Sequence, residues 1–322
     1  MNANDKIVIT GGAGLVGQNL IVRLKQRGFN RLVAIHKHPA NTATLRRLHP
    51  DITVIEADLA EPGEWEGAFA GASAVILSQA QIGSLSREHF DRNNVVASQR
   101  ILDVVRSQRK TLLVVHISSS VVNSRAVDFY TETKGPGEAG VGERPAVHGA
   151  APDTDVRMVR PQASRLARAV HPKGAHLQGP GPGRLPAQPL YVGDLCNMII
   201  ACLDDRFAGR TFDISGLEQM TYLDIVRQIK DVVGSRTVIV RVPFRLFWWL
   251  LRAYAVFDTD PPFTTRQLEA LVIPESFPLI DWPAMFGCMP TSFPAAVEET
   301  FREPTYSRVF PRVLSKPRKR SP

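Results

Sequence analysis

Apolar and polar positions at the start of the chain separate a strand from a helix. Residues 6–10 form a short run rich in β-branched side chains, and glycines follow at once. Beyond them, apolar residues recur at helical spacing until the pattern stops near Gly28. This order predicts a strand, a glycine-rich turn and a helix.

Three glycines give this turn a specific chemistry. Gly11 is expected to allow the tight turn, Gly14 to let the backbone approach a pyrophosphate, and Gly17 to let the helix pack closely on the strand. The helix begins at Leu15 and Val16, where unpaired N–H groups and the positive end of the helix dipole can face phosphates. An ordinary turn is the alternative, but the flanking strand and helix favour a dinucleotide-binding site.

The alternation of strand and helix patterns continues along the chain. A long helical pattern spans 87–108, and the run 112–117 has the composition of a buried strand. This alternation predicts an α/β fold, a Rossmann-type doubly wound parallel sheet with a smaller C-terminal substrate domain. Further strands are expected at 31–35, 53–56, 74–77, 211–214 and 237–242, and helices at 195–203, 221–233 (capped by Thr221, with Asp224 three residues on), 244–257 and 295–301.

The end of the second strand bears on the choice of cofactor. An acid there would hold the ribose 2′-hydroxyl of NAD, whereas a basic group accepts the 2′-phosphate of NADP. The chain has His36 and Lys37 at that place, Arg46 a little further on, and no acid. The cofactor is therefore expected to be NAD or NADP, with a weak lean to NADP.

Hydroxyl and basic residues after the fifth strand indicate proton transfer. Ser118 and Ser119 begin a serine cluster, and Tyr130 and Lys134 follow at helical spacing. A lysine ammonium near a phenol favours the phenolate, so Tyr130 can exchange a proton near neutral pH. A serine hydroxyl at the strand end can hold the reacting oxygen. The alternative is an ordinary helix that contains this spacing by chance.

These motifs together resemble the extended or atypical short-chain dehydrogenases/reductases of the NAD-dependent epimerase/dehydratase family. The short interval between the serines and Tyr130 is similar to the branch that includes the dehydrogenase-like accessory subunit of respiratory complex I. The matching stretches are TGGAGLVG at 10–17, ISSS at 117–120, YTETK at 130–134 and PLYVGD at 189–194, together with Asp58-Leu59 and Asn94.

The resemblance implies a Ser-Tyr-Lys site acting on a small molecule, a nucleotide sugar or similar carbinol, and it allows a homodimer. Two departures from the family pattern are the missing acid at His36 and LSQA at 77–80, where the family usually has a pair of small residues. By position, the resemblance implies that Asp58 (with Leu59) contacts the adenine and that Lys134 contacts the nicotinamide ribose. Tyr130 would be the acid/base, and Ser118 or its neighbour Ser119 would be its partner. Asn94 would support the site from its helix.

One segment departs from the rest in composition. Residues 131–190 contain no Phe, Tyr, Trp or Ile and hold nine of the 24 prolines, with neither a strand nor a helix period. Pro136, between two glycines, follows Lys134 almost directly, and a proline inside a helix costs about 3 kcal/mol. A poorly ordered stretch over 135–187 and little activity are therefore expected.

A compensated reading-frame shift accounts for this composition. Residues 145–170, read one frame over with permitted codons, can give a string containing LRPT and a following FG, which resembles the sixth strand and nicotinamide loop of the family. We interpret about 135–187 as an out-of-frame version of a normal catalytic segment. The rival interpretation is a natural, divergent insertion.

Charge and composition exclude several classes of function. Of the net charge of +8, most lies in 302–322, with seven Lys/Arg against one Glu, and in 135–187, with seven against four acids, so the rest is nearly neutral. Nucleic-acid binding is therefore not expected. Three scattered cysteines indicate neither a disulfide framework nor a metal site. The expected division is a NAD(P)-binding domain at 1–216, a smaller substrate or lid region at 217–301 and a basic disordered tail at 302–322.

Three functional hypotheses remain open at this stage. The first is a NAD(P)-dependent epimerase/dehydratase or dehydrogenase-like enzyme, the second a non-catalytic NAD(P)-binding assembly or redox-sensing protein, and the third an inactive product of the frame shift. A cytoplasmic protein without signal peptide or transmembrane segment is expected. The run 244–257 is interpreted as an amphipathic helix over the substrate cleft or against a partner, and a membrane-surface helix is the less favoured alternative.

Overall fold

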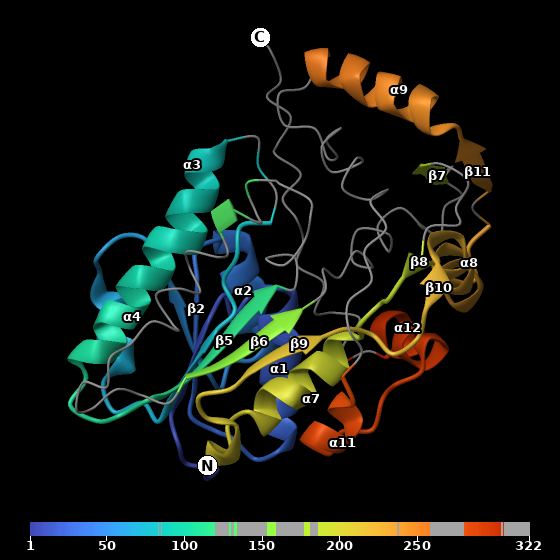
Figure 1. Ribbon diagram of the computed structural model, residues 1–322. Coiled ribbons are helices and arrows are strands. Elements are labelled where there is room, and N and C mark those ends of the chain that lie inside the picture. The colour runs from blue at the N-terminus through green and yellow to red at the C-terminus, as the bar shows by residue number, and fades with distance from the viewer. Residues whose placement is uncertain are drawn as a thin grey trace.

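The computed structural model is organised around one parallel sheet (Figure 1). It describes residues 1–82, 84, 86–119, 129, 132–133, 153–158, 177–180, 186–236, 238–257, 280–303 and 305. The sheet strands are β1 (Ile7–Thr10), β2 (Leu32–His36), β3 (Thr53–Glu56), β4 (Ala74–Leu77), β5 (Leu113–Ser119), β6 (Asp153–Met158) and β9 (Thr211–Ile214). Within the described residues their order is β3-β2-β1-β4-β5-β6-β9, and all neighbours pair in parallel. The predicted Rossmann-type doubly wound sheet is confirmed.

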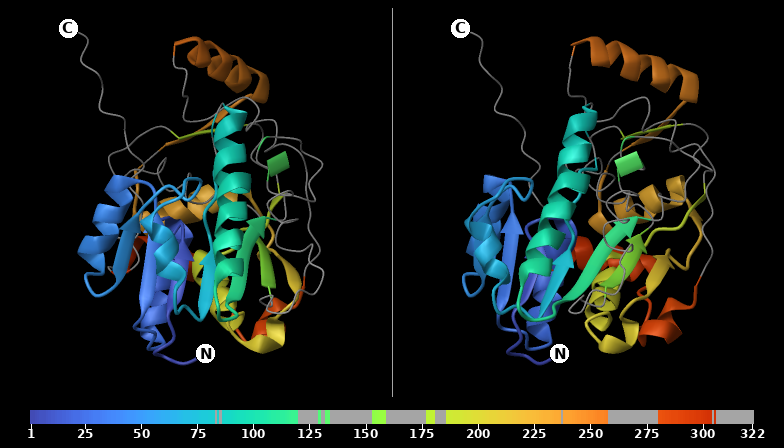
Figure 2. Two further views of the ribbon diagram at one scale, coloured as in Figure 1. Left: turned by 90° about the vertical axis from the view of Figure 1, so that its left-hand side faces the viewer. Right: turned by 60° about the vertical axis from the view of Figure 1, so that its left-hand side comes forward.

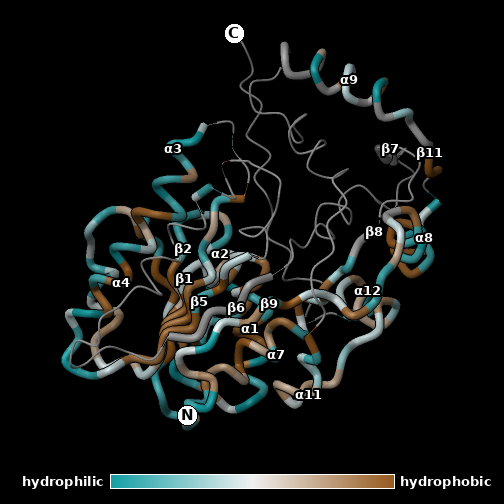
Figure 3. Tube along the Cα trace, viewed as in Figure 1, coloured by the Kyte–Doolittle hydropathy of each residue, from teal (hydrophilic) through white to brown (hydrophobic). Residues whose placement is uncertain are grey.

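Helices cover both faces of this sheet, and alternate strand residues feed two cores. Ile7 and Ile9 pack in one cluster with helices α1 (Leu15–Gln26) and α7 (Val192–Ala201), whereas Val8 packs in the other. Figure 3 shows hydrophobic residues concentrated along the central strands. The second face is covered by α4 (Ala97–Ser107) and the 3-10 helix η1 (Glu64–Phe69), while α2 (Pro39–Leu48) contributes to the first.

Several predicted elements differ from expectation by one to three residues at their ends, and two of these differences have a clear physical reason. The strand expected at 112–117 extends through Ser119, because its two serines pair with β6 and are buried. Helix α7 begins at Val192, three residues before the predicted start, with Asp194 in its first turn where a carboxylate complements the helix dipole. The glycine at 193 hides this start because glycine has a low helix propensity.

Three strands lie inside 135–187, where the composition predicts a poorly ordered stretch. Besides β6, they are β7 (Leu177–Pro180), paired with β11 (Ile239–Val242), and β8 (Pro186–Ala187), paired with β10 (Met220–Thr221). Strand β6 fills the place between β5 and β9. The backbone edges of those two strands offer donors and acceptors to a chain of any composition, so the missing side-chain period does not prevent pairing.

The C-terminal part builds a small core of its own and also returns to the large one. Helices α8 (Tyr222–Val233) and α12 (Phe293–Arg302) share a separate apolar cluster. In contrast, α11 (Trp282–Phe286) packs into the large core, next to the short helix η4 (Asp205–Phe207). Thr221 accepts a hydrogen bond from the Asp224 N–H, so the predicted cap of α8 is confirmed.

Helix α9 (Phe244–Phe257) follows β11 and lies at the periphery, clear of the sheet in every view (Figures 1 and 2). Among the described residues, no helix has both the length and the apolar character needed to cross a membrane.

Candidate functional site

The glycine-rich turn approaches its neighbours too closely for side chains. Gly11 has a φ of 68°, and a Cβ there would lie 2.8 Å from the backbone of Ser78 and Gln79. A Cβ on Gly17 would lie 2.5 Å from the Cα and carbonyl oxygen of Gly12. L residues avoid both situations. The tight turn predicted at Gly11 is confirmed, whereas Gly17 is required by contact with the turn itself rather than with the strand.

The first turn of α1 is not fully buried. Gly14 is its N-cap in an extended conformation and, as a glycine, supplies no capping side chain. A Cβ on Gly14 would approach only the Gly11 carbonyl oxygen, at 3.0 Å. Gly14, Leu15 and Val16 are half-buried, unlike their buried neighbours. Because β1 pairs with β2 on one side and β4 on the other, the N–H groups of this first turn lie at the switch point of the sheet.

Asp58 lies just beyond β3 in a network of donors. It accepts hydrogen bonds from the Ala60 N–H at 3.0 Å and from Arg92 at 3.2 Å. Burial raises the pKa of Asp58, but these two partners outweigh burial and hold the pKa below its ordinary value. Arg92 also pairs with Glu61 at 2.7 Å. The side chain of Leu59 is buried in the second core, so only its backbone is available to a ligand.

The basic groups expected at the end of β2 separate into different roles. The Lys37 ammonium donates to Asn93 Oδ1 at 2.7 Å, and burial lowers its pKa. Burial also lowers the pKa of His36 to about 4, which leaves that imidazole neutral at pH 7. Arg46 donates to the Val54 carbonyl at 3.1 Å and thereby braces β3. Lys37 is therefore the cationic group at this strand end.

Asn94 connects two segments of the candidate site. It is 2% exposed and lies in η2 (Asp91–Val96), a π-helical turn between α3 (Arg87–Phe90) and α4. Its Oδ1 accepts from the Gln81 N–H at 2.7 Å, and its Nδ2 donates to the Gln81 carbonyl at 3.2 Å and to Thr133 Oγ1 at 3.1 Å. Isolated π turns inside α-helices are frequent at functional sites.

The predicted catalytic residues are only partly placed. Ser118 and Ser119 are buried at the carboxyl end of β5, in register with β6. Tyr130 and Lys134 lie outside the described residues. Thr133, which the structure does describe, is buried, and its Oγ1 donates to the Phe129 carbonyl at 2.6 Å.

The stretch LSQA at 77–80, which departs from the family pattern, contributes to a cluster of polar side chains next to the glycine turn. Thr10 Oγ1 contacts Gln79 Oε1 in a short hydrogen bond, and Gln79 Nε2 donates to Ser98 Oγ at 3.2 Å. Ser78 Oγ donates to the Thr10 carbonyl at 2.6 Å. The larger Gln79 side chain thus joins β1 to α4 beneath the glycine turn. No pattern in the single sequence predicts this link.

The PLYVGD stretch forms a buried polar connection between α1, α7 and α12. Arg23 donates to Glu299 at 2.7 Å and to Tyr191 Oη at 3.2 Å. Burial raises the pKa of Tyr191, so the phenol stays protonated at neutral pH. Asp194 accepts from the Thr291 N–H at 3.0 Å and its hydroxyl at 2.7 Å, while burial raises the pKa of Asp194.

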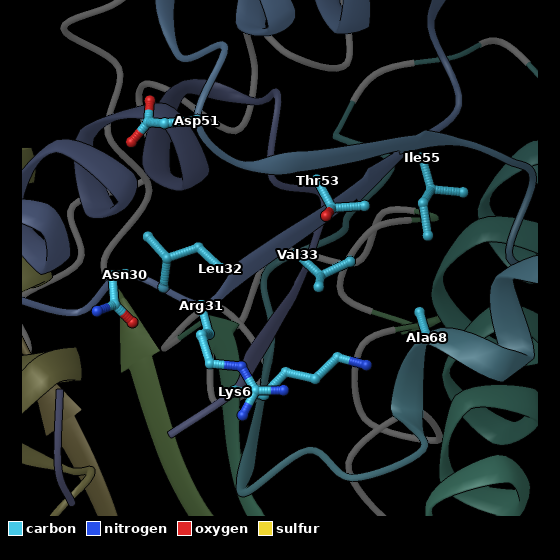
Figure 4. A pocket seen from close by; sticks show the side chains of 9 residues that line it. All are labelled: Lys6, Asn30, Arg31, Leu32, Val33, Asp51, Thr53, Ile55 and Ala68. Carbon is cyan, nitrogen blue, oxygen red and sulfur yellow. The ribbon is translucent and has the colours of Figure 1, made fainter. Parts of the chain in front are cut away.

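A separate depression lies at the amino ends of the strands, away from the glycine turn (Figure 4). Its volume is about 340 Å³. It lies where β1, β2 and β3 begin, whereas ligands of doubly wound sheets bind at the carboxyl ends. We therefore do not assign it to the candidate site. Its lining includes Lys6, Arg31, Asp51 and Thr53.

Similarity to a known protein family covers the N-terminal part of the chain. Residues 7–137 match the model of the NAD dependent epimerase/dehydratase family. Over nearly the whole chain, the sequence is 25% identical to the 2-alkyl-3-oxoalkanoate reductase of Stenotrophomonas maltophilia, covering 92% of this chain and 97% of that protein. It is 22% identical to the ceramide reductase of Caulobacter vibrioides, covering 75% of each.

The fold is shared with solved structures of epimerases. One is the UDP-glucuronic acid 4-epimerase of Bacillus cereus in complex with NAD, with a TM-score of 0.64 and 19% identity. The alignment covers 83% of this chain and 99% of the epimerase. The site geometry and these comparisons together identify the matched N-terminal part as a Rossmann-type domain similar to those of NAD-dependent epimerases and dehydratases.

Proposed function

We propose that this chain is a NAD(P)-binding protein of the NAD-dependent epimerase/dehydratase family. The observation that carries the proposal is the glycine turn, whose contacts at Gly11 and Gly17 exclude side chains while the N-cap Gly14 supplies none to the start of α1. Such a cradle fits a pyrophosphate bound to backbone N–H groups. The family match over residues 7–137 supports the same cofactor class.

Residues at the ends of β2 and β3 hold the adenosine part in this proposal. Asp58 and the Leu59 backbone lie beside the adenine, and Lys37 meets the ribose. A 2′-phosphate needs a cation, and the Lys37 ammonium, which donates to Asn93, supplies one at the end of β2. We therefore keep the weak preference for NADP over NAD, with His36 as a neutral neighbour.

The proposed reaction moves a proton through Tyr130. Lys134 favours the phenolate and holds the nicotinamide ribose, and Ser118 or Ser119 binds the reacting oxygen. Thr133 lies between Tyr130 and Lys134 in the sequence, and its hydrogen bond to Asn94 supports a positioning role for that amide. The nicotinamide, when bound, exchanges a hydride with the substrate carbon.

The substrate in this proposal is a carbinol or the corresponding ketone. The B. cereus epimerase acts on a UDP sugar, and that likeness supports a nucleotide sugar. The two curated relatives are named for a 2-alkyl-3-oxoalkanoate and a ceramide, both of which carry alkyl chains. Because the S. maltophilia relative aligns with 92% of the chain, a long-chain 3-oxo acid is the second candidate substrate.

A protein that binds NAD(P) without turnover, as an assembly or redox-sensing component of the complex I accessory-subunit type, is the alternative. The specific observation is that the family match ends at residue 137, where the aberrant segment begins. We propose that about 135–187 is out of frame, which would leave the binding site whole and the catalytic segment altered. Sequencing the gene beside those of near relatives tests this, and an uninterrupted common frame would contradict it.

Cofactor titration separates these possibilities. We expect NADPH and NADH to bind the full chain in a fluorescence titration, and Gly14→Val to weaken binding at least tenfold, because a side chain there would occupy the phosphate position. Gly67→Val is the matched control, since a Cβ at Gly67 meets nothing within 4 Å. Absence of binding by the natural chain would refute the proposal.

Turnover assays with UDP-glucuronate and with a long-chain 3-oxo acid then decide the substrate. Binding without turnover of either compound favours the non-catalytic alternative, and robust turnover excludes an inactive product. Light scattering of the same samples tests the homodimer.

A further inference from the structure

Helix α9 exposes large apolar side chains that neither core of the protein uses. Leu246 is 53% exposed, Trp249 64% and Leu250 48%. They occupy positions i, i+3 and i+4, so they lie on adjacent places of one helical side. The helix also stands at the periphery, beyond β11 and clear of the sheet (Figures 1 and 2). Three such side chains in little more than one turn form a patch rather than scattered exposure.

The same side of α9 carries positive charge at one border. At 3.6 residues per turn, the exposed residues follow one another around the helix in a single arc. Arginines form one end of the arc, and the apolar residues form the rest. The segment 244–257 contains no Asp or Glu. In angular order the arc consists of Arg252, Arg245, Trp249, Ala253, Leu246 and Leu250, all of them exposed.

We propose that this arc, the α9 face, docks on the surface of an anionic lipid bilayer. Apolar side chains next to arginines, with tryptophan between them, match the boundary between acyl chains and negatively charged headgroups. Trp248 adds a second indole beside Arg252, whose guanidinium lies 5.2 Å from its ring centroid. A helix of 14 residues is about 21 Å long, too short to cross a hydrocarbon core of about 30 Å. It therefore lies on the membrane.

Charge argues against a second copy of the chain as the occupant. Two α9 faces packed against each other would bring four arginines together with no acid from either helix. An anionic bilayer supplies the missing negative charge and a deformable apolar layer at once. The sequence alone favoured a helix that covers the substrate cleft or packs on a partner. The exposed apolar side chains of α9 favour the membrane-surface helix instead. Docking does not depend on a bound dinucleotide.

Vesicle sedimentation tests the α9 face with the full chain. The probes are vesicles of phosphatidylcholine alone and vesicles with about one third phosphatidylglycerol. We expect the protein to sediment with the anionic vesicles, to shift its tryptophan emission to the blue, and to bind at least fivefold less to neutral ones. The double variant Trp249→Glu/Leu250→Glu should lose roughly tenfold in partitioning, as should Arg245→Glu/Arg252→Glu on anionic vesicles.

Matched variants control for the chemistry of the substitutions. Met289→Glu changes an apolar residue that is 86% exposed outside α9, and Arg109→Glu/Lys110→Glu reverses two exposed cations next to α4. Both should bind like the natural chain, with circular dichroism confirming that every variant folds. A natural chain that stays in the supernatant, or equal binding by the α9 variants, overturns the proposal. A dimer in solution that Trp249→Glu/Leu250→Glu dissociates would assign the face to a second copy instead.

Discussion

At the scale of single residues, burial decides which basic groups at the end of β2 carry charge. His36 ends β2 with its ring against His38, at a centroid distance of 5.3 Å, and Asn41 contacts its Nε2 at 3.3 Å. Burial lowers its pKa to about 4, and the positive charges of His38 and Lys37 act in the same direction. His36 therefore makes the stability of the fold depend on pH. At pH 7 it carries no charge with which to bind a phosphate.

The direction of that effect follows from proton linkage. The pKa of His36 is about 4 in the folded chain and about 6.5 in the unfolded chain. As the pH falls below about 6.5, His36 binds a proton in the unfolded chain but not in the folded chain. The contribution of His36 to stability is therefore complete above that pH and is lost as the pH falls toward 4.

We expect His36→Asn to reduce the loss of unfolding free energy between pH 7 and pH 5 by about 2 kcal/mol, since asparagine does not titrate. Urea unfolding at the two pH values measures this difference. His89→Asn is the control, because it makes the same substitution at an exposed histidine. An equal loss in the natural chain and in His36→Asn would contradict the expectation.

How much the sequence predicts at this scale depends on whether a residue acts through its backbone or through its partners. The role of Gly11 was predictable because a strand, a turn and a helix in order dictate the local conformation. Arg92, which binds Asp58, was not, since an arginine on a helix has no local signal for a partner 34 residues away. Gln79 was visible only as a departure from a family pattern.

At the scale of elements, the long helix at 87–107 is interrupted where it meets the candidate site. Its π turn places Asn94 so that one amide satisfies both the N–H and the carbonyl of Gln81 and still donates to Thr133. A single residue thus ties the loop after β4 to the segment that contains Tyr130 and Lys134 in the sequence. Helical periodicity predicts the length of the helix but cannot predict a turn with one extra residue.

We expect Asn94→Ala to destabilise the fold by about 1–3 kcal/mol, because it removes three hydrogen bonds made by a side chain that is 2% exposed. Where the natural chain turns over a substrate, kcat should fall more than KM rises, since the amide positions groups rather than touching substrate. Thermal unfolding and steady-state kinetics measure the two effects.

Gln99→Ala provides the matched control on the same helix. Its amide donates only to Asp103, at an exposed position, so stability should change by less than about 0.5 kcal/mol. A comparable loss in both variants would show that the helix, and not the Asn94 bridge, is responsible.

Strand β6 shows a different limit of sequence reasoning at this scale. Its residues, DTDVRM, are half charged, whereas parallel strands between two neighbours are usually apolar throughout. Backbone pairing with β5 and β9 places it nonetheless, because neighbouring strands outweigh local composition. The fold is therefore compatible with either origin of 135–187, and only the gene sequence distinguishes a shifted frame from divergence.

At the scale of the whole molecule, the C-terminal part is joined to the Rossmann-type domain by a largely buried ion pair. Arg23 has a side chain only 8% exposed and pairs with Glu299, 276 residues away. Gly193 makes room for this pair, since a Cβ there would lie 2.3 Å from the Arg23 guanidinium. Neither partner could be identified from the sequence, because contacts of such separation leave no local pattern. The PLYVGD motif indicated that residues 189–194 resemble the family, but it did not predict their contacts with α1 and α12.

We expect Glu299→Ala to cost about 3 kcal/mol, because it removes the carboxylate that pairs with the buried Arg23 guanidinium at 2.7 Å. Glu298→Ala, one residue earlier in α12, removes a pair with Arg302 in which both side chains are more than half exposed, and should cost less than about 1 kcal/mol. Denaturant unfolding of both variants measures the contrast. Adding Arg23→Met to Glu299→Ala should recover part of the loss, since a buried charge that has lost its Glu299 partner is then removed. If Glu299→Ala and Glu298→Ala destabilise the protein equally, the buried pair does not hold α12 to the Rossmann-type domain.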